Sequence, residues 1–316
     1  MPSRTGKDKV KWLKIVLSSP PELVDALSNF VTELGAEGVF QEYLAPQGAG
    51  DFPESTSREL VNAYLPCDVR LENRLASLKT YLHSLSQIFP DLDAPELSTE
   101  VITDPDWGEQ WKKYFKPLRV SRNIVIKPTW ERYTPLGHDI VIEIDPGMAF
   151  GTGQHASTRM CLEALEDIIL TKRSPASLNV LDVGTGTGIL GIACAKLGAQ
   201  KVLCVDIDPK ATEIAQENIT INQVEDRVTV TQREISTLTD SYDLIVANLT
   251  SKLLIKLKKS LISLLRPGGY LILSGIIDQN RSDIETHFFN GTLVPHSSAM
   301  EKEWVCFVMK KETEQP

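Results

Sequence analysis

Cysteine is scarce in this sequence and follows no metal-binding or disulfide pattern. Only five of the 316 residues are cysteine, and no two of them form a CxxC pair. An odd, unpatterned set in a reducing compartment is typical of buried thiols rather than of disulfides or a zinc site. The sequence therefore predicts a protein that binds no metal ion.

Long apolar runs are also missing. The run LISLLRPGGYLIL is interrupted by Arg-Pro-Gly-Gly at 266–269, and no stretch approaches the ~18 uninterrupted apolar residues that a membrane helix requires. The first residues, MPSRTGKDKV, are polar and basic with no apolar segment behind them, so we expect no secretory signal. We therefore expect a cytoplasmic protein without a membrane-spanning segment.

The sequence has no excess of positive charge either. The formal net charge is −9, which argues against a sequence-independent grip on nucleic-acid phosphates. The charge suits a small-molecule substrate or a basic protein partner equally well. Apolar residues make up 42% of a chain that is longer than single cores usually are, so we expect a globular monomer of two domains.

The first hundred residues alternate short apolar strands with amphipathic helices. Their order, βαββαβ, predicts a ferredoxin-like sandwich, which we place at residues 1–103. The predicted strands cover 11–17, 39–44, 60–65 and 100–103, and the predicted helices cover 21–35 and 69–89.

An aromatic and basic segment follows. We assign residues 104–129 to an interdomain linker, in which residues 104–120 form a bridging helix and then an entry strand. Trp107, Trp111 and Phe115 recur at i, i+4 and i+8, which is the spacing of any amphipathic helix.

The rest of the chain, residues 130–316, predicts an α/β domain. From residue 179 onward, strands alternate with helices as in a parallel, doubly wound, Rossmann-like sheet. We expect a turn at 267–269, and a polar loop before the last strand at 304–309.

The segment VLDVGTGTGIL, residues 180–190, leads from an apolar strand through Gly184, Gly186 and Gly188 into a helix. Ligands bind at this edge of open α/β sheets. A dinucleotide site requires G-x-G-x-x-G, but Ile189 occupies the third glycine position. The pattern G-x-G-x-G is typical of S-adenosylmethionine enzymes, although a tight turn without any ligand stays an alternative.

Two further strands end in polar side chains. Asp206 ends the strand after the glycine loop, where a carboxylate can accept hydrogen bonds from both ribose hydroxyls. Asp208 is better placed to cap the helix that begins at Pro209. Asn248 ends a later buried strand and offers amide donors and an acceptor beside a transferable methyl group, or serves only as a turn residue.

A fourth motif, DPGMAFGTGQHASTRMCLEAL, occupies residues 145–165. Its segment Gly151-Thr152-Gly153 could fold over a bound ligand, and Ser157 or Thr158 could cap or begin the following helix. His155 is a candidate acid–base residue, but a lone histidine is more often structural.

These motifs resemble the ribosomal protein L-eleven methyltransferases, the PrmA family. The resemblance spans residues 104–280 and rests on DWGEQWKKYFKPLRV, DPGMAFGTGQHAST with CLEAL, LDVGTGTGIL, GAQKVLCVDIDPKA, VANLTSKLL and RPGGYLILSGI. It implies a class I methyltransferase fold and a small N-terminal domain that recognises the ribosomal protein. It also implies that S-adenosylmethionine contacts Thr158, Gly184, Asp206 and Asn248. The positions of the two glycine-containing loops add Thr152 and Gly186 as predicted contacts.

The resemblance implies methylation of lysine or N-terminal amines of ribosomal protein L-eleven, with Asn248 as the catalytic residue. Asn248 is followed by Leu-Thr-Ser rather than by the Pro-Pro-Tyr or Pro-Pro-Trp run associated with planar nitrogens, which favours flexible amines. The alternatives are a methyltransferase of RNA or a small molecule, a binding protein without activity and, least supported, a nicotinamide oxidoreductase.

Overall fold

Two compact units make up the chain in the computed structural model. Clustering of contacts assigns Met1–Phe115 with Pro146–Met148 to the first and Lys116–Asp145 with Ala149–Pro316 to the second. The structure describes residues 11–42, 58–102, 112, 115–145, 153, 155–171, 177–289 and 291–313. The predicted bridging helix lies largely outside these residues, and the linker assignment stays a prediction. In the described part of the chain, no helix is both long and apolar enough to cross a membrane.

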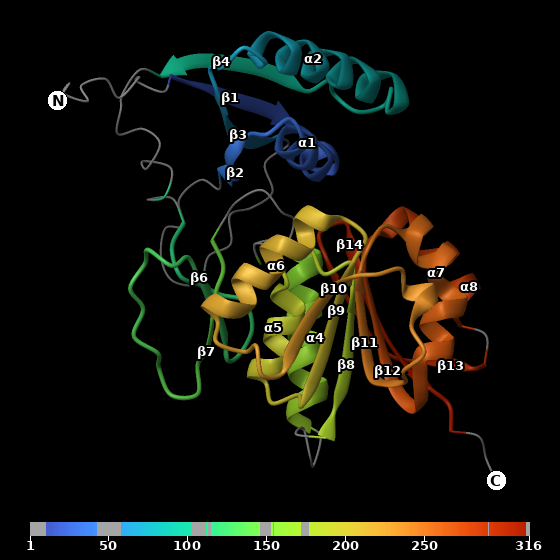
Figure 1. Ribbon diagram of the computed structural model, residues 1–316. Coiled ribbons are helices and arrows are strands. Elements are labelled where there is room, and N and C mark those ends of the chain that lie inside the picture. Colours follow the sequence, from blue (N-terminus) through green and yellow to red (C-terminus); the bar gives the residue numbers. More distant parts are fainter. Residues whose placement is uncertain are drawn as a thin grey trace, which may run out of the picture. The chain divides into compact units, whose positions relative to one another are not determined.

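The first unit is an α+β sandwich with a four-stranded antiparallel sheet in the order β2-β3-β1-β4. Its elements are β1 (Trp12–Ser19), α1 (Pro21–Glu33), β2 (Glu37–Glu42), β3 (Glu59–Pro66), α2 (Leu71–Ile88) and β4 (Glu96–Ile102) (Figure 1). The predicted ferredoxin-like order βαββαβ is therefore confirmed.

Alternation along β1 explains why the helices cover one face of this sheet. Leu13, Ile15 and Leu17 are buried, and the residues between them are partly exposed. Because side chains alternate across a strand, the three buried ones point to the same face. They share a core there with Leu27 of α1 and Leu78 of α2.

The second unit contains a seven-stranded sheet in the order β10-β9-β8-β11-β12-β14-β13. All its neighbouring strands are parallel except β14, which is antiparallel to both β12 and β13. The doubly wound sheet is therefore confirmed. Its strands are β8 (Asn179–Val183), β9 (Lys201–Asp206), β10 (Val228–Gln232), β11 (Tyr242–Asn248), β12 (Leu265–Ile277), β13 (Leu293–Glu301) and β14 (Trp304–Lys311).

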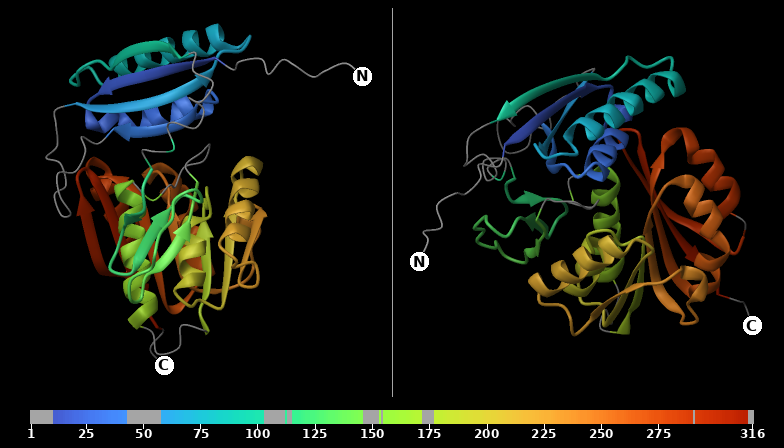
Figure 2. Two further views of the ribbon diagram at one scale, coloured as in Figure 1. Left: turned by 90° about the vertical axis from the view of Figure 1, so that its left-hand side faces the viewer. Right: turned by 45° about the horizontal axis from the view of Figure 1, so that its top comes forward.

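Helices cover both faces of this sheet (Figures 1 and 2). They are α4 (Ala156–Thr171), α5 (Ile189–Lys196) and α6 (Pro209–Ile221) on one face, and α7 (Ser251–Leu264) and α8 (Arg281–Phe288) on the other. Residues of β11 alternate between the two cores: Leu244 and Val246 belong to the first, and Ile245 and Ala247 to the second. Because β11 is buried on both faces, its sequence is a continuous apolar run rather than an alternation of apolar and polar residues.

One sequence prediction about the last strands is wrong, and another is met only in part. The supposed polar loop contains β13, an edge strand of Leu293–Glu301 that pairs with β14. Most of its side chains are exposed, so it lacks the apolar alternation that identifies a strand. The predicted turn at 267–269 falls within the bounds of β12, but the pairing with β11 is interrupted there: it passes from Leu265 to Tyr270, and Gly268 between them has a φ of +76°.

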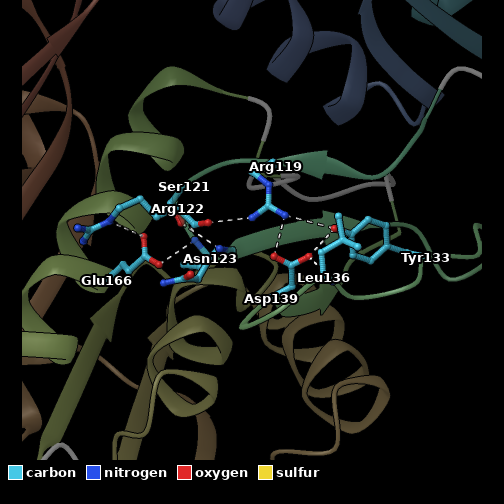
Figure 3. Close-up of polar contacts among 9 residues, drawn as sticks. Arg119, Ser121, Arg122, Asn123, Tyr133, Leu136, Asp139 and Glu166 are labelled. Atoms are coloured by element: carbon cyan, nitrogen blue, oxygen red, sulfur yellow. Dashed lines mark hydrogen bonds and ion pairs between the residues drawn. The ribbon is translucent and has the colours of Figure 1, made fainter. Parts of the chain in front are cut away.

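A smaller three-stranded sheet precedes α4. It consists of β5 (Leu118–Arg119), β6 (Ile124–Lys127) and β7 (Ile140–Glu143). Asp139 organises it by accepting hydrogen bonds from Arg119 Nη2 at 2.7 Å and from the Tyr133 hydroxyl at 2.6 Å (Figure 3). The Tyr133 hydroxyl, the Leu136 amide and Arg119 lower the pKa of Asp139 to about 2. The carboxylate therefore stays charged at neutral pH and closes the loop before β7.

Candidate active site

The glycine loop is formed by backbone conformations that only glycine adopts easily. Gly184, Gly186 and Gly188 have φ values of +71°, +55° and +82°. The amide of Gly184 donates to the Val205 carbonyl of the neighbouring strand at 2.9 Å. A Cβ on Gly184 would lie 2.4 Å from Leu249 Cδ2, so glycine lets the loop pack closely against Leu249.

The structure brings two predicted cofactor residues together. The Gly186 amide donates to Asp206 Oδ2 at 3.1 Å, and the Asp208 amide donates to Oδ1 at 3.1 Å. Each carboxylate oxygen has a second lone pair, which can accept a ligand hydroxyl. Asp208 caps α6 by accepting from the Lys210 amide at 2.9 Å, as the sequence predicts.

Asp182, to which the sequence analysis gave no role, holds the glycine loop through hydrogen bonds. Its Oδ2 accepts from Thr185 Oγ1 at 2.6 Å and from the Gly191 amide at 3.1 Å. The side chain is fully buried, and this burial raises the pKa of Asp182 to about 6. A carboxylate at the end of a buried strand, just before the glycines, was the signal in the sequence.

Helix α5 approaches the sheet at Gly191 rather than at the third position of a dinucleotide motif. A Cβ on Gly191 would lie 2.2 Å from Cys204 Sγ. Ile189 instead lies buried in the core between helix and sheet. The loop thus achieves close helix–strand packing with a spacing different from that of dinucleotide sites.

Asn248 and Thr158, which are 90 positions apart, meet at the same edge of the sheet. Asn248 Nδ2 donates to Thr158 Oγ1 at 3.2 Å. Asn248 Oδ1 is buried and has no hydrogen-bond partner among the described residues. Gly275, also missed from the sequence, allows this placement because a Cβ there would lie 2.9 Å from that oxygen. The site therefore presents a fixed, unused amide acceptor.

His155 acts as a cap for helix α4. Its Nδ1 accepts from the Ser157 amide at 3.2 Å and lies 2.6 Å from Ser157 Oγ. Because the amide can only donate, the neutral imidazole carries its proton on Nε2. The other ring nitrogen therefore offers no free lone pair, and His155 is not placed to act as a general base. Helix α4 begins at Ala156, so neither Ser157 nor Thr158 is its cap.

Two residues of the fourth motif, Asp145 and Gly153, lie next to β6. Asp145 accepts from the Thr129 amide at 2.6 Å and from Thr129 Oγ1 at 2.8 Å. Gly153 has a φ of +82°, and a Cβ there would lie 2.0 Å from Ile126 Cδ1. The predicted contact Thr152 lies outside the described residues, so its role stays a prediction.

The thiols form no metal site in the described residues. Cys161, Cys194, Cys204 and Cys306 are buried and free, and Cys67 is partly exposed. Burial raises the pKa of Cys194 and Cys204 well above the ordinary value. Among the described residues, no group of three or more potential ligands from histidine, cysteine, aspartate and glutamate could hold a metal ion.

Comparison with known proteins identifies the family. Residues 11–312 match the profile of ribosomal protein L11 methyltransferase (PrmA). The chain belongs to this family. The ribosomal protein L11 methyltransferase of Citrifermentans bemidjiense is 40% identical over 303 residues, which cover 95% of this chain and 98% of that protein. The corresponding protein of Heliobacterium modesticaldum is 38% identical over 324 residues, which cover 96% of this chain and 98% of that protein.

A solved structure of the PrmA family agrees with the fold. The ribosomal protein L11 methylase of Lactobacillus delbrueckii subsp. bulgaricus is 31% identical, with a TM-score of 0.58. The match covers 63% of this chain and 100% of the Lactobacillus chain. The predicted class I methyltransferase fold and PrmA membership are therefore confirmed. The individual cofactor contacts stay predictions.

Proposed function

We propose that this enzyme transfers methyl groups from S-adenosylmethionine to amino groups of ribosomal protein L11. The observation that carries the proposal is the arrangement at Asn248, whose buried Oδ1 accepts no hydrogen bond within the described residues while its Nδ2 is held by Thr158. A buried amide oxygen without a donor is costly, and an incoming amine would supply one. The relatives named above are L11 methyltransferases, which supports L11 as the acceptor.

The residues at the glycine loop suit S-adenosylmethionine. Gly184 and Gly186, both with positive φ, form the loop that would approach the amino-acid part of the cofactor, and the free lone pairs of Asp206 suit the ribose hydroxyls. Thr158 and Asn248 lie where the transferable methyl group is expected. When bound, the cofactor supplies that group: the amine lone pair forms the new N–C bond, the C–S electron pair stays on sulfur, and the amine proton passes to water.

The amine must be neutral when it reacts. A lysine of pKa ~10.4 is almost fully protonated at neutral pH, and holding it neutral costs roughly 4 to 5 kcal/mol. Desolvation beside the positive sulfonium lowers this pKa, so no strong protein base is needed, in agreement with the capping role of His155. Asn248 Oδ1 accepts an N–H of the amine and aligns its lone pair with the methyl group.

The first unit would recognise L11 in the cytoplasm, because the predicted cofactor contacts, from Thr152 to Asn248, all lie in the second. A fragment of residues 104–316 should then bind S-adenosylmethionine but methylate L11 poorly, since presenting a protein amine draws on binding energy from a remote surface. Equal rates of L11 methylation by the fragment and the full chain would remove this role from the first unit.

The proposal as a whole is tested with labelled S-adenosylmethionine and an extract that contains ribosomal proteins, RNA and small molecules. Label in a single protein that comigrates with L11 supports it. Label in RNA or in the small-molecule fraction supports the alternative acceptors, and cofactor binding without any transfer leaves only a binding protein.

A further inference from the structure

The turn between β13 and β14 lies at the same edge of the sheet as Asn248. Asn248 is paired in register with Ser274 of β12. Ser274 Oγ donates to the carbonyls of Ser157 at 3.2 Å and of Val305 at 3.3 Å. Val305 is therefore held against the first turn of α4, and Trp304 is the residue that precedes it.

This turn is fixed by contacts with several elements. The Glu303 carbonyl accepts from the Asp278 amide at 2.8 Å, and Glu301 forms an ion pair with Arg159 of α4. The ring of Trp304 meets that of His155 edge to face, with centroids 4.7 Å apart. The Trp304 ring is thereby held against His155, at the start of the helix that carries Thr158.

We propose that Trp304 is the acceptor-side wall of the site, where it holds the aliphatic chain and the methylated nitrogen of the substrate amine. The proposal rests on the methyltransferase function proposed above. Trp304 packs against the core but keeps part of its surface exposed. An indole offers apolar area to the methylenes of a lysine and an electron-rich face to an alkylammonium group.

The charges around Trp304 favour an aromatic wall over an acidic one. Glu301 is already neutralised by Arg159. A free carboxylate beside the amine would raise the pKa of that amine and oppose the neutral form that reacts. An indole attracts the amine but changes the pKa of the amine less than a carboxylate would. The attraction of the indole also persists when methyl groups replace the N–H donors of the amine. Trp304 should therefore retain partly methylated amines for further transfer.

The same sheet contains a matched control. Tyr270 and His296 also meet edge to face, with centroids 5.1 Å apart, and Tyr270 also packs on the same core while partly exposed. Tyr270 lies towards the opposite end of β12, paired with Leu244 rather than with the residues beside Asn248. Trp304→Leu and Tyr270→Leu thus remove similar aromatic pairs, and only the first lies at the proposed wall. Trp304→Phe keeps an aromatic face at the site.

The test combines three readouts on the full-length enzyme. These are the dissociation constant for S-adenosylmethionine, the dissociation constant for L11 measured with S-adenosylhomocysteine present, and the methyl states of L11 after limited turnover. Trp304→Leu should weaken L11 binding by roughly fivefold to tenfold and shift products toward monomethylated amines, with cofactor affinity within about twofold of wild type. Trp304→Phe and Tyr270→Leu should both resemble the wild type.

Two results would overturn the proposal. The first is a Trp304→Leu variant with wild-type L11 affinity and methyl states. The second is a parallel loss of cofactor and L11 binding in both Trp304 variants, which would make the residue structural. Absence of L11 methylation by the wild type would instead overturn the proposed function, so the two failures are distinguishable.

Discussion

Asn248 Nδ2 donates a hydrogen bond of 3.2 Å to Thr158 Oγ1 and so joins the end of β11 to the first turn of α4. In this arrangement the amide nitrogen faces Thr158 and the amide oxygen points away from it. The amide oxygen is buried and has no hydrogen-bond partner among the described residues. In the proposed mechanism this oxygen is the acceptor for the incoming amine.

Asn248→Ala should reduce methyl transfer more than cofactor affinity. Loss of a hydrogen bond to a nitrogen that becomes charged costs about 1.5 to 3 kcal/mol, or roughly tenfold to 150-fold in kcat. Single-turnover rates and calorimetry with S-adenosylmethionine separate the two effects. Thr158→Ser, which keeps the hydroxyl, serves as the control and should retain most of the rate. Equal losses in rate and affinity would make Asn248 a cofactor contact alone.

Gly275→Ala should impair catalysis without unfolding the protein. Gly275 has a φ of +78°, and its new Cβ would lie 2.7 Å from the Leu249 carbonyl and 2.9 Å from Asn248 Oδ1, which must move. We expect kcat to fall by at least about tenfold, which corresponds to ~1.4 kcal/mol. Gly291→Ala is the matched control, since Gly291 has a φ of +85° with nothing within 4 Å of the new Cβ. Similar activities of the two variants would show that the position of Asn248 does not matter.

Much of the second unit could be predicted because its strands are buried on both faces. The runs that form β8, β9 and β11 are apolar, which identifies them as buried strands. β8 leads into glycine, and β9 and β11 end in Asp and Asn, so the sequence also indicates the edge of the sheet where a ligand binds. The edge strand β13 could not be recognised, since its mostly exposed side chains carry no apolar period. The short strands β6 and β7 were also missed, because four residues are too few to show periodicity.

Site residues could be predicted only where a polar side chain stands alone at the end of an apolar strand. Asp206 and Asn248 ended strands at the expected edge, and the structure brings each beside a predicted neighbour. Asp182 and Gly275 were missed because their roles depend on distances across strands that are far apart in the sequence. The cap at His155 depends on which ring nitrogen faces the Ser157 amide, and a sequence does not contain that information.

Asp206→Ala should weaken S-adenosylmethionine binding by roughly tenfold to 150-fold, because charge-assisted hydrogen bonds contribute about 1.5 to 3 kcal/mol. It also releases the Gly186 amide from its 3.1 Å bond. Asp208→Ala, two residues away, removes the helix cap and should cost about 1 kcal/mol of stability with little change in affinity. Calorimetry and urea unfolding of both variants provide the comparison. Unchanged affinity in a folded Asp206→Ala protein would refute the ribose assignment.

Asp182 should make the protein less stable as the pH rises. Its folded pKa is raised from 3.8 to about 6, so the folded state binds the proton more tightly than the unfolded state does. The free energy of unfolding therefore decreases between about pH 4 and pH 6, by up to about 3 kcal/mol, and is constant above that window. In Asp182→Asn this decrease should be absent. Urea unfolding of both proteins from pH 4 to 7.5 checks this, and a stability difference that does not change with pH would contradict it.

The most direct measurement is peptide-level mass spectrometry of purified L11 after reaction with this enzyme and S-adenosylmethionine, with Asn248→Ala run in parallel. The account predicts methyl groups on lysine or N-terminal amines of L11 with the wild-type enzyme, and far fewer at equal times with the variant. Methyl groups on glutamine or another planar nitrogen, or an L11 that gains none while the enzyme binds the cofactor, would contradict it.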